Sequence, residues 1–299
     1  MKKILVGLTF LTAVSSATFF SCKKSEINKQ ATASNQSTSK VSSETLEKIK
    51  TTTSSFIIKE HSHNFTKRPQ WLQTILDDLS GAAKGAPLAV INPALGVGAA
   101  ITCGIISSMK AVYQNNSNSS NNQIRNISFP ISSTVSNSNN PYDYVGYWHY
   151  YTLNSALSNT SNYEDINDSF SYCVTYSFIS STLTSNNVFG GTSFSSIIGG
   201  NYSTLKSDFN YVASLSTTTC SSALYQMHSD GYINDVQYSV LSDYFDAIDN
   251  SNSASDFATY SVDIENDIVS DTSLSSNDKQ CLLMIMSTAR YSLQYYSLQ

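Results

Sequence analysis

Charged side chains are scarce in this sequence. Asp, Glu, Lys and Arg make up 13% of its 299 residues, about half of the usual quarter. Proline and glycine are also few, at 5 and 12 residues, whereas 19 tyrosines and many Ser, Thr and Asn supply polarity. With an apolar content of 40%, this composition excludes a simply disordered chain and supports a packed core.

Basic residues almost vanish from the second part of the chain. Residues 126–299 contain only Lys206, Lys279 and Arg290 beside 16 acidic residues, whereas residues 22–125 carry 12 basic and 6 acidic residues. A body this acidic repels phosphate backbones, so we expect no nucleic-acid partner. The basic part would serve as a solubilising tether, or would lie against an anionic membrane surface.

Familiar catalytic motifs are missing as well. The sequence has no Gly-x-Ser-x-Gly elbow, His-Glu-x-x-His, Walker loop, Rossmann fingerprint or Cys-x-x-Cys, which are the short patterns that carry a known mechanism. The aspartates between residues 230 and 249 lack the alternate spacing and the final Glu of an EF-hand loop. We therefore expect no cofactor and favour a protein that is not an enzyme.

Histidines mark two weak candidate sites. His61 and His63 are two apart, so on a strand both rings would face one side and could share a metal. No third ligand is near in sequence, which favours an exposed loop. His149 is the candidate general base, with carboxylates such as Asp143 in its expected neighbourhood. The alternative is a satisfied histidine in the core or at its boundary.

The first two dozen residues have the pattern of a secretory signal. Two lysines precede the apolar run Ile4–Thr18, and Phe19-Phe20-Ser21-Cys22 closes it. This resembles a bacterial lipoprotein signal, in which Cys22 becomes the lipidated first residue of the mature chain. Phe19 stands where Leu is commonest and Phe20 where a small residue is usual. A plain secretory signal and an uncleaved anchor are the alternatives.

The organisation of the remaining chain follows from shifts in composition and from helical periodicity. We divide it into a signal peptide (1–21), a flexible tether (22–43), a basic N-terminal helical segment with a Gly/Ala-rich helix (44–114), an Asn/Ser-rich connection (115–140) and an acidic, Tyr-rich helical region (141–299). Candidate helix caps support the helices of the last region: Asn234, Ser253 or Ser255, and Ser276.

A stretch of 25 residues between Lys84 and Lys110 carries no charge. Small residues recur in and beside it at intervals of four, a spacing that allows helix backbones to approach closely. The helix-packing positions are Gly81, Gly85, Gly96, Ala100 and Gly104. We expect a tightly packed central helix. The alternative is a membrane-inserting element spanning residues 85–109, although prolines leave only about 17 uninterrupted residues, near the lower limit for a span.

Four cysteines remain if Cys22 is lipidated. They are Cys103, Cys173, Cys220 and Cys281, an even number in a compartment that permits disulfides. Their pairing stays open. Cys103 and Cys281 lie in strongly apolar segments, where a buried thiol is the commoner state.

Three short segments carry a further resemblance. Gly146-Tyr147-Trp148-His149 followed by Leu153, the stretch 81–109 and the closing segment 268–292 are similar to those of uncharacterised helical lipoproteins of Bacteroidota. Tyr150 replaces the Asn that often follows the histidine in those proteins. The resemblance implies an all-α envelope lipoprotein and implies no particular activity.

The sequence therefore predicts an all-α protein, an irregular helical bundle around a Gly/Ala-rich central helix, behind a cleaved lipoprotein signal and a flexible tether. We expect it to be lipid-anchored in a bacterial cell envelope, extracytoplasmic and most simply at the outer membrane. Its partners would be the membrane, through the N-terminal lipid, and another protein or a glycan. The alternative function is that of a membrane-active, bacteriocin-like or pore-forming protein that inserts residues 85–109.

Overall fold

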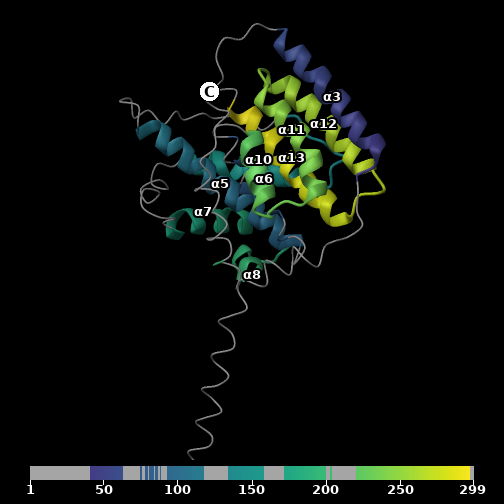
Figure 1. Ribbon diagram of the computed structural model, residues 1–299. Coiled ribbons are helices and arrows are strands. Elements are labelled where there is room, and N and C mark those ends of the chain that lie inside the picture. The colour runs from purple at the N-terminus through teal and green to yellow at the C-terminus, as the bar shows by residue number, and fades with distance from the viewer. Residues whose placement is uncertain are drawn as a thin grey trace, which may run out of the picture. The chain divides into compact units, whose positions relative to one another are not determined.

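Helices make up the regular structure of the described part of the chain (Figure 1). The computed structural model describes residues 41–62, 75, 78–79, 81–83, 85–86, 88, 93–117, 134–157, 172–199, 203 and 220–296. Among these residues there is no strand, which confirms the predicted all-α fold. The helices with defined bounds are α3 (Ser43–His61), α5 (Pro93–Ser117), α6 (Asp143–Leu157), α7 (Tyr172–Ser185), α8 (Phe194–Ile198), α10 (Cys220–Ser229), α11 (Asp235–Asp249), α12 (Ala254–Ser270) and α13 (Ser276–Tyr296).

Several predicted features lie outside the described residues. They are the signal peptide 1–21, Cys22, nearly all of the tether 22–43 and His63. The predicted connection 115–140 is described only at its two ends. At the first end α5 continues to Ser117, and at the second residues 134–140 lead into α6.

The C-terminal helix α13 lies in the interior. Every side chain from Gln280 to Tyr295 is buried, and α13 packs against α5, α6, α11 and α12. A helix buried on all sides is usually apolar all round, but α13 also carries polar residues. The hydroxyl of Thr288 donates to the carbonyl of Met284 at 2.9 Å, so it is satisfied within the helix. Arg290 has no such local solution and needs partners from other elements.

The Gly/Ala-rich helix α5 is also an interior helix. It packs against α6, α7, α8 and α13, and Leu95, Ile101 and Ile105 are at most 1% exposed. Its apolar side chains therefore contribute to the core of the bundle. None of the helices that the structure describes combines the length and hydropathy of a membrane span.

Small residues let the segment before α5 approach that helix closely. A Cβ at Gly81 would lie 2.6 Å from the backbone of Cys103, and one at Gly85 would lie 2.3 Å from the backbone of Ala99. Both distances are shorter than a real Cβ contact, so only glycine fits at these two positions. Two other positions of the predicted spacing are buried within α5: Gly96 and Ala100.

Helix α3 lies along α12 and α11 (Figure 1) and is held at both ends. Beside its N-terminus, the Ser42 amide donates to Asp271 Oδ2 at 3.1 Å, just beyond the end of α12. At its C-terminal end, Glu60 Oε2 accepts from the amide of Asn252 and, at 3.1 Å, from that of Ser253, the N-cap of α12. The two helices are therefore antiparallel, with a carboxylate contact at each end.

This arrangement joins the basic and the acidic parts of the chain. Lys59 on α3 forms an ion pair with Asp256 on α12, with 2.9 Å between Nζ and Oδ1. The apolar side chains of Ile49 and Phe56 are buried in the same core as those of α12. Residues 39–299 accordingly form one compact unit.

Local capping signals define where several helices begin. The side chain of Asn234 accepts from the amide of Gln237, whose side chain accepts from the amide of Asn234. This capping box starts α11 where it was predicted. Of the two candidate serines before α12, Ser253 is the cap. The cap of α13 is Ser275, which accepts from the amide of Asp278, so Ser276 is the first residue of that helix and its predicted role as the cap is wrong.

Candidate functional site

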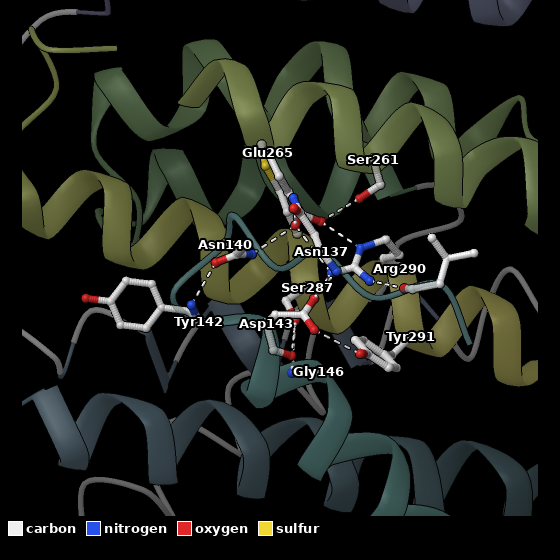
Figure 2. Close-up of polar contacts among 12 residues, drawn as sticks. Asn137, Asn140, Tyr142, Asp143, Gly146, Ser261, Glu265, Ser287, Arg290 and Tyr291 are labelled. Atoms are coloured by element: carbon white, nitrogen blue, oxygen red, sulfur yellow. Dashed lines mark hydrogen bonds and ion pairs between the residues drawn. The ribbon is translucent and has the colours of Figure 1, made fainter. Parts of the chain in front are cut away.

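Arg290 is the centre of a buried ionic network (Figure 2). Its side chain is fully buried, and its Nε donates to Glu265 Oε1 at 2.9 Å. One terminal nitrogen donates to both Asp143 and Glu265, and the other donates to the carbonyl of Val135. Burial alone would lower the pKa of the guanidinium, but the carboxylates of Glu265 and Asp143 raise it above its ordinary value. Arg290 is therefore charged at any physiological pH.

Glu265, on α12, accepts hydrogen bonds at both of its oxygens. Oε1 accepts from the Ser261 hydroxyl at 2.9 Å, and Oε2 accepts from the side-chain amides of Asn137 at 3.0 Å and Asn140 at 2.9 Å. The Tyr244 hydroxyl lies 2.7 Å from that of Ser261 and extends the network to α11. A carboxylate at this depth is tolerated when its lone pairs are occupied, and here they are.

Asp143 connects this network to the protein surface. It is the first residue of α6, and its side chain is 18% exposed. Oδ1 accepts from Arg290 and from the Asn137 amide at 3.1 Å, and Oδ2 accepts from the Tyr291 hydroxyl at 3.0 Å. Burial and the Asp143 charge raise the pKa of Tyr291, so the phenol remains a donor. Because these contacts already occupy both oxygens of the Asp143 carboxylate, the side chain is better suited to fixing the surface than to transferring a proton.

The turn 134–140 is fixed by the same contacts (Figure 2). Asn140 donates to Glu265 with its side-chain nitrogen, and its side-chain oxygen accepts from the Tyr142 amide at 2.8 Å. The Asn137 side chain also donates to Glu265, while its oxygen accepts from the Asn139 amide at 3.1 Å. The entry into α6 is thus set by a carboxylate from α12, which leaves this turn little freedom to move.

Helix α6 is held against α13 by a second contact. The Ser287 hydroxyl accepts from the Gly146 amide at 3.0 Å and donates to the Asp143 carbonyl at 2.9 Å. A Cβ at Gly146 would lie 2.4 Å from the Ser287 carbonyl oxygen, so only glycine allows this close approach. The N-terminal turn of α6 is therefore rigidly placed on α13.

A pocket of about 430 Å³ lies beside this rigid turn. Its volume lies in the lower part of the range of small-molecule sites, about 300–1,000 Å³, but it is an open depression on the surface and does not enclose a ligand. The lining residues are Ser136, Asn137, Ser138, Asn140, Pro141, Asp143, Tyr144, Tyr147 and Tyr291. None of these described lining residues is basic, and the one charged residue, Asp143, is paired with Arg290.

Aromatic rings continue from the pocket along α6. Tyr144 is 39% exposed and Tyr147 is half-buried. The rings of Tyr147 and Tyr151 are inclined by only 18°, with their centroids 6.3 Å apart, and Trp148 packs edge-on against both. Positions 144, 147 and 151 are three and four residues apart, so they share one side of the helix. Burial and the neighbouring Tyr142 phenol raise the pKa of Tyr144, which keeps its hydroxyl neutral.

His149 lies away from this surface and is fully buried. Its Nε2 lies 3.3 Å from Asp78 Oδ2. Burial raises the pKa of Asp78, while the charge and hydrogen bond of His149 act in the opposite direction. A Cβ at Gly104 would lie 2.8 Å from the imidazole ring, so Gly104 provides the space that the ring fills. The candidate general base is thus enclosed by protein, and a substrate has no access to it in this conformation.

His61, one of the two candidate metal ligands, does not lie on a strand. His61 is the last residue of helix α3, and its Nε2 lies 3.0 Å from Asn250 Oδ1. His61 is therefore helical, and it does not have the strand conformation that would align its ring with that of His63. Within the described part of the chain, no group of three or more His, Cys, Asp and Glu side chains is placed to hold a metal ion.

Cys103 and Cys281, the two cysteines in apolar segments, are buried thiols, as the sequence indicated. Burial, together with the nearby Asp278 charge, raises the pKa of Cys281, which keeps this thiol in its unreactive protonated form. The side chains of Cys173 and Cys220 lie outside the described residues.

Comparisons with protein-family models, with curated proteins and with solved structures found no match to this chain. The function must therefore be argued from the chain's own residues.

The network around Arg290 was not recognised from the sequence. One signal was present, because Arg290 is one of three basic residues in the acidic region and stands in the helix that contains the apolar run Cys281–Met286. A lone cation in such a helix must find acidic partners if that helix is buried. The tyrosines at positions 144, 147 and 151 also stand at helical spacing in the sequence, but nothing in the sequence indicated that they lie beside a pocket.

Proposed function

We propose that this chain is a lipid-anchored protein of a bacterial cell envelope, held through Cys22 on the extracytoplasmic side, most simply at the outer membrane. Its helical body would bind another molecule, a protein or a glycan, and would not catalyse a reaction. The anchoring part rests on the apolar run that ends at Cys22. The binding part rests on one structural observation, the pocket beside the rigid N-terminal turn of α6.

The groups around this pocket favour recognition over catalysis. Hydrogen bonds to Arg290, Asn137 and Tyr291 occupy the Asp143 carboxylate. The remaining lining side chains are neutral hydroxyls, amides, a proline and aromatic rings. Such groups fix the orientation of a ligand, whereas general acid–base chemistry needs a group that gains and loses a proton. A preformed surface of this kind binds without the cost of ordering itself.

Metabolic labelling with a palmitate analogue tests the anchor. Cells would express the wild type, Cys22→Ala and the matched control Ser25→Ala. We expect the label in membrane-bound wild type and Ser25→Ala, and an unlabelled, membrane-released Cys22→Ala. An unlabelled Cys22→Ala chain that stays in the membrane after removal of its signal would overturn lipid anchoring through Cys22.

A photo-crosslinking residue at Ser138, on the pocket lining, tests the binding role in intact cells. The control position is Tyr225 on α10, which is 62% exposed and is not one of the pocket residues. We expect a specific adduct from position 138 and none of the same mass from position 225. Equal crosslinking from the two positions would contradict a binding role for the pocket.

The alternative proposal is a membrane-active protein that inserts residues 85–109. Its support is the charge-free stretch around α5. Insertion would require Leu95, Ile101 and Ile105 to leave the core in which they are buried, at a cost of about 2 kcal/mol for each apolar side chain exposed to water on the way. Leakage of dye from liposomes on addition of the folded protein would favour this alternative, and intact liposomes would exclude it.

A further inference from the structure

We propose that the pocket beside α6 binds a neutral oligosaccharide, with a sugar ring lying against the exposed Tyr144 and the chain continuing along the half-buried Tyr147 and Tyr151. This inference rests on the proposed binding role of the pocket and names the chemistry of its ligand. Three properties of the described surface support it. They are the row of aromatic rings, the charge of the lining residues and the hydrogen bonds that orient the lining residues in advance.

The aromatic row matches the shape of a sugar. A pyranose ring has a flat face of C–H groups and an edge of hydroxyls, so it is bound by an aromatic face together with polar groups at the side. Tyr144 and Tyr147 line the pocket, and Tyr151 continues the row. At 1.5 Å rise per residue, the seven steps from position 144 to position 151 extend about 10 Å along the helix. This length suits a short chain of sugars better than a single ring.

The charge of the pocket points to a neutral ligand. An anionic ligand would need a basic residue or a cluster of amide donors, and none of the described lining residues is basic. A cationic ligand would need an available carboxylate, but both oxygens of Asp143 already accept hydrogen bonds, Oδ1 from Arg290 and Asn137 and Oδ2 from Tyr291. The hydroxyls of Ser136 and Ser138 and the phenol of Tyr147 can instead donate to and accept from sugar hydroxyls.

The floor of the pocket is set before any ligand arrives. Glu265 fixes Asn137 and Asn140, and Ser287 fixes the first turn of α6. Sugar hydroxyls lose hydrogen bonds to water when they bind, so affinity depends on groups that are already oriented. Arg290 and Glu265, which are not among the lining residues, supply this orientation from behind the pocket.

Titration calorimetry on the detergent-solubilised mature protein tests the inference. The probes are neutral hexasaccharides of glucose, mannose and xylose, with an oligogalacturonate as the anionic counterpart and a glucosamine oligomer as the cationic one. We expect at least one neutral hexasaccharide to bind, and neither charged oligomer to bind more tightly. Absence of binding by every neutral probe, or tighter binding of a charged one, would overturn the inference.

Two variants and a control locate the binding. Tyr144→Ala removes an exposed ring, and Tyr144→Phe keeps the ring while removing its hydroxyl; Tyr225→Ala removes an equally large exposed ring elsewhere. We expect Tyr144→Ala to weaken binding at least tenfold, Tyr144→Phe to weaken it less than threefold, and Tyr225→Ala to leave it unchanged. Circular dichroism would verify that each variant is folded. Equal affinities for all three variants would place the ligand elsewhere and overturn the proposal.

The outcomes also separate this inference from the proposed function. A protein adduct from position 138 in cells, without binding of any neutral oligosaccharide, would leave the binding role standing and reject the glycan. Loss of palmitate labelling concerns only the anchor. Neutral-oligosaccharide binding that depends on Tyr144 would support both the pocket and its ligand class.

Discussion

Arg290 and Glu265 are 25 positions apart in the sequence and form an ion pair in which neither side chain is exposed, with 2.9 Å between Nε and Oε1. The pair joins α13 to α12, and Asp143 extends it to α6. Taking these charges out of water is costly, so the arrangement is stable only while all partners are present. The same charges orient the turn 134–140, which lines the pocket. The stability of the fold and the shape of the pocket therefore depend on the same contacts.

Removal of the Arg290 side chain should be severely destabilising. Arg290→Met would leave the Glu265 carboxylate buried without a cation, and we expect the free energy of unfolding to fall by about 3–5 kcal/mol. Arg290→Lys keeps the charge but loses the planar fork, so we expect a smaller loss. Urea unfolding followed by circular dichroism measures both. The double variant Arg290→Met/Glu265→Gln should recover part of the loss. Equal stability of Arg290→Met and Arg290→Lys would refute this account.

The close approach at Gly85 should tolerate no side chain. Gly85→Ala would place a Cβ 2.3 Å from the backbone of Ala99, and backbone cannot rotate away. We expect a loss of about 3 kcal/mol or more in unfolding free energy, which outweighs the higher helix propensity of alanine. The matched control is Gly98→Ala, whose nearest contact is the ring of Phe194 at 3.0 Å. A side chain can shift, so we expect a cost near 1 kcal/mol. Thermal unfolding of the two variants would contradict this reasoning if it gave the opposite order.

The contact between Asp271 and the start of α3 should depend on pH. Burial acts to raise the pKa of Asp271, but hydrogen bonds from Ser273, Thr45 and Ser42 hold it well below its ordinary value. The resulting stabilisation is fully present above the unfolded-state pKa, about 3.9, and is lost as pH falls through the lower folded-state pKa. We expect Asp271→Asn to cost about 1 kcal/mol at pH 7, with allowance for screening by solvent. The difference between the two proteins should shrink below pH 4 in urea unfolding, and a constant difference down to pH 2 would show that the charge is irrelevant.

The enclosure of His149 can be tested by chemical modification. Diethyl pyrocarbonate should modify the exposed His61 and the partly exposed His228 in the folded protein, because both rings reach solvent. His149 should react only after unfolding, since it is fully buried against Gly104 and Asp78. Peptide mass spectrometry at several reaction times distinguishes the sites. Modification of His149 at the rate of His61 would reopen its candidacy as a reacting base.

Features that depend on neighbouring residues were predictable from the sequence, and long-range pairing was not. Asn234 and Gln237 are three residues apart, so their capping box could be anticipated from helix geometry. Arg290 instead contacts residues 25, 147 and 155 positions away, and periodicity indicates which face is buried without naming its partners. His61 was misplaced for a local reason, since the sequence favoured an exposed loop there, with a strand as the geometry of the metal alternative, whereas the helix that begins at Ser43 continues through His61.

The position of α3 has a mechanical consequence if the chain is tethered through Cys22. Tension between membrane and body would then enter the bundle at the N-terminus of α3, where the Ser42 amide and Asp271 are the first to carry load. Ile49, Phe56 and Glu60 follow in order along the helix, so detachment would proceed from one end, turn by turn, and would not break every contact at once. Elements that open locally in this way separate at lower force than the whole domain unfolds. The junction nearest the membrane would therefore yield first, while the helices that form the pocket keep their shape.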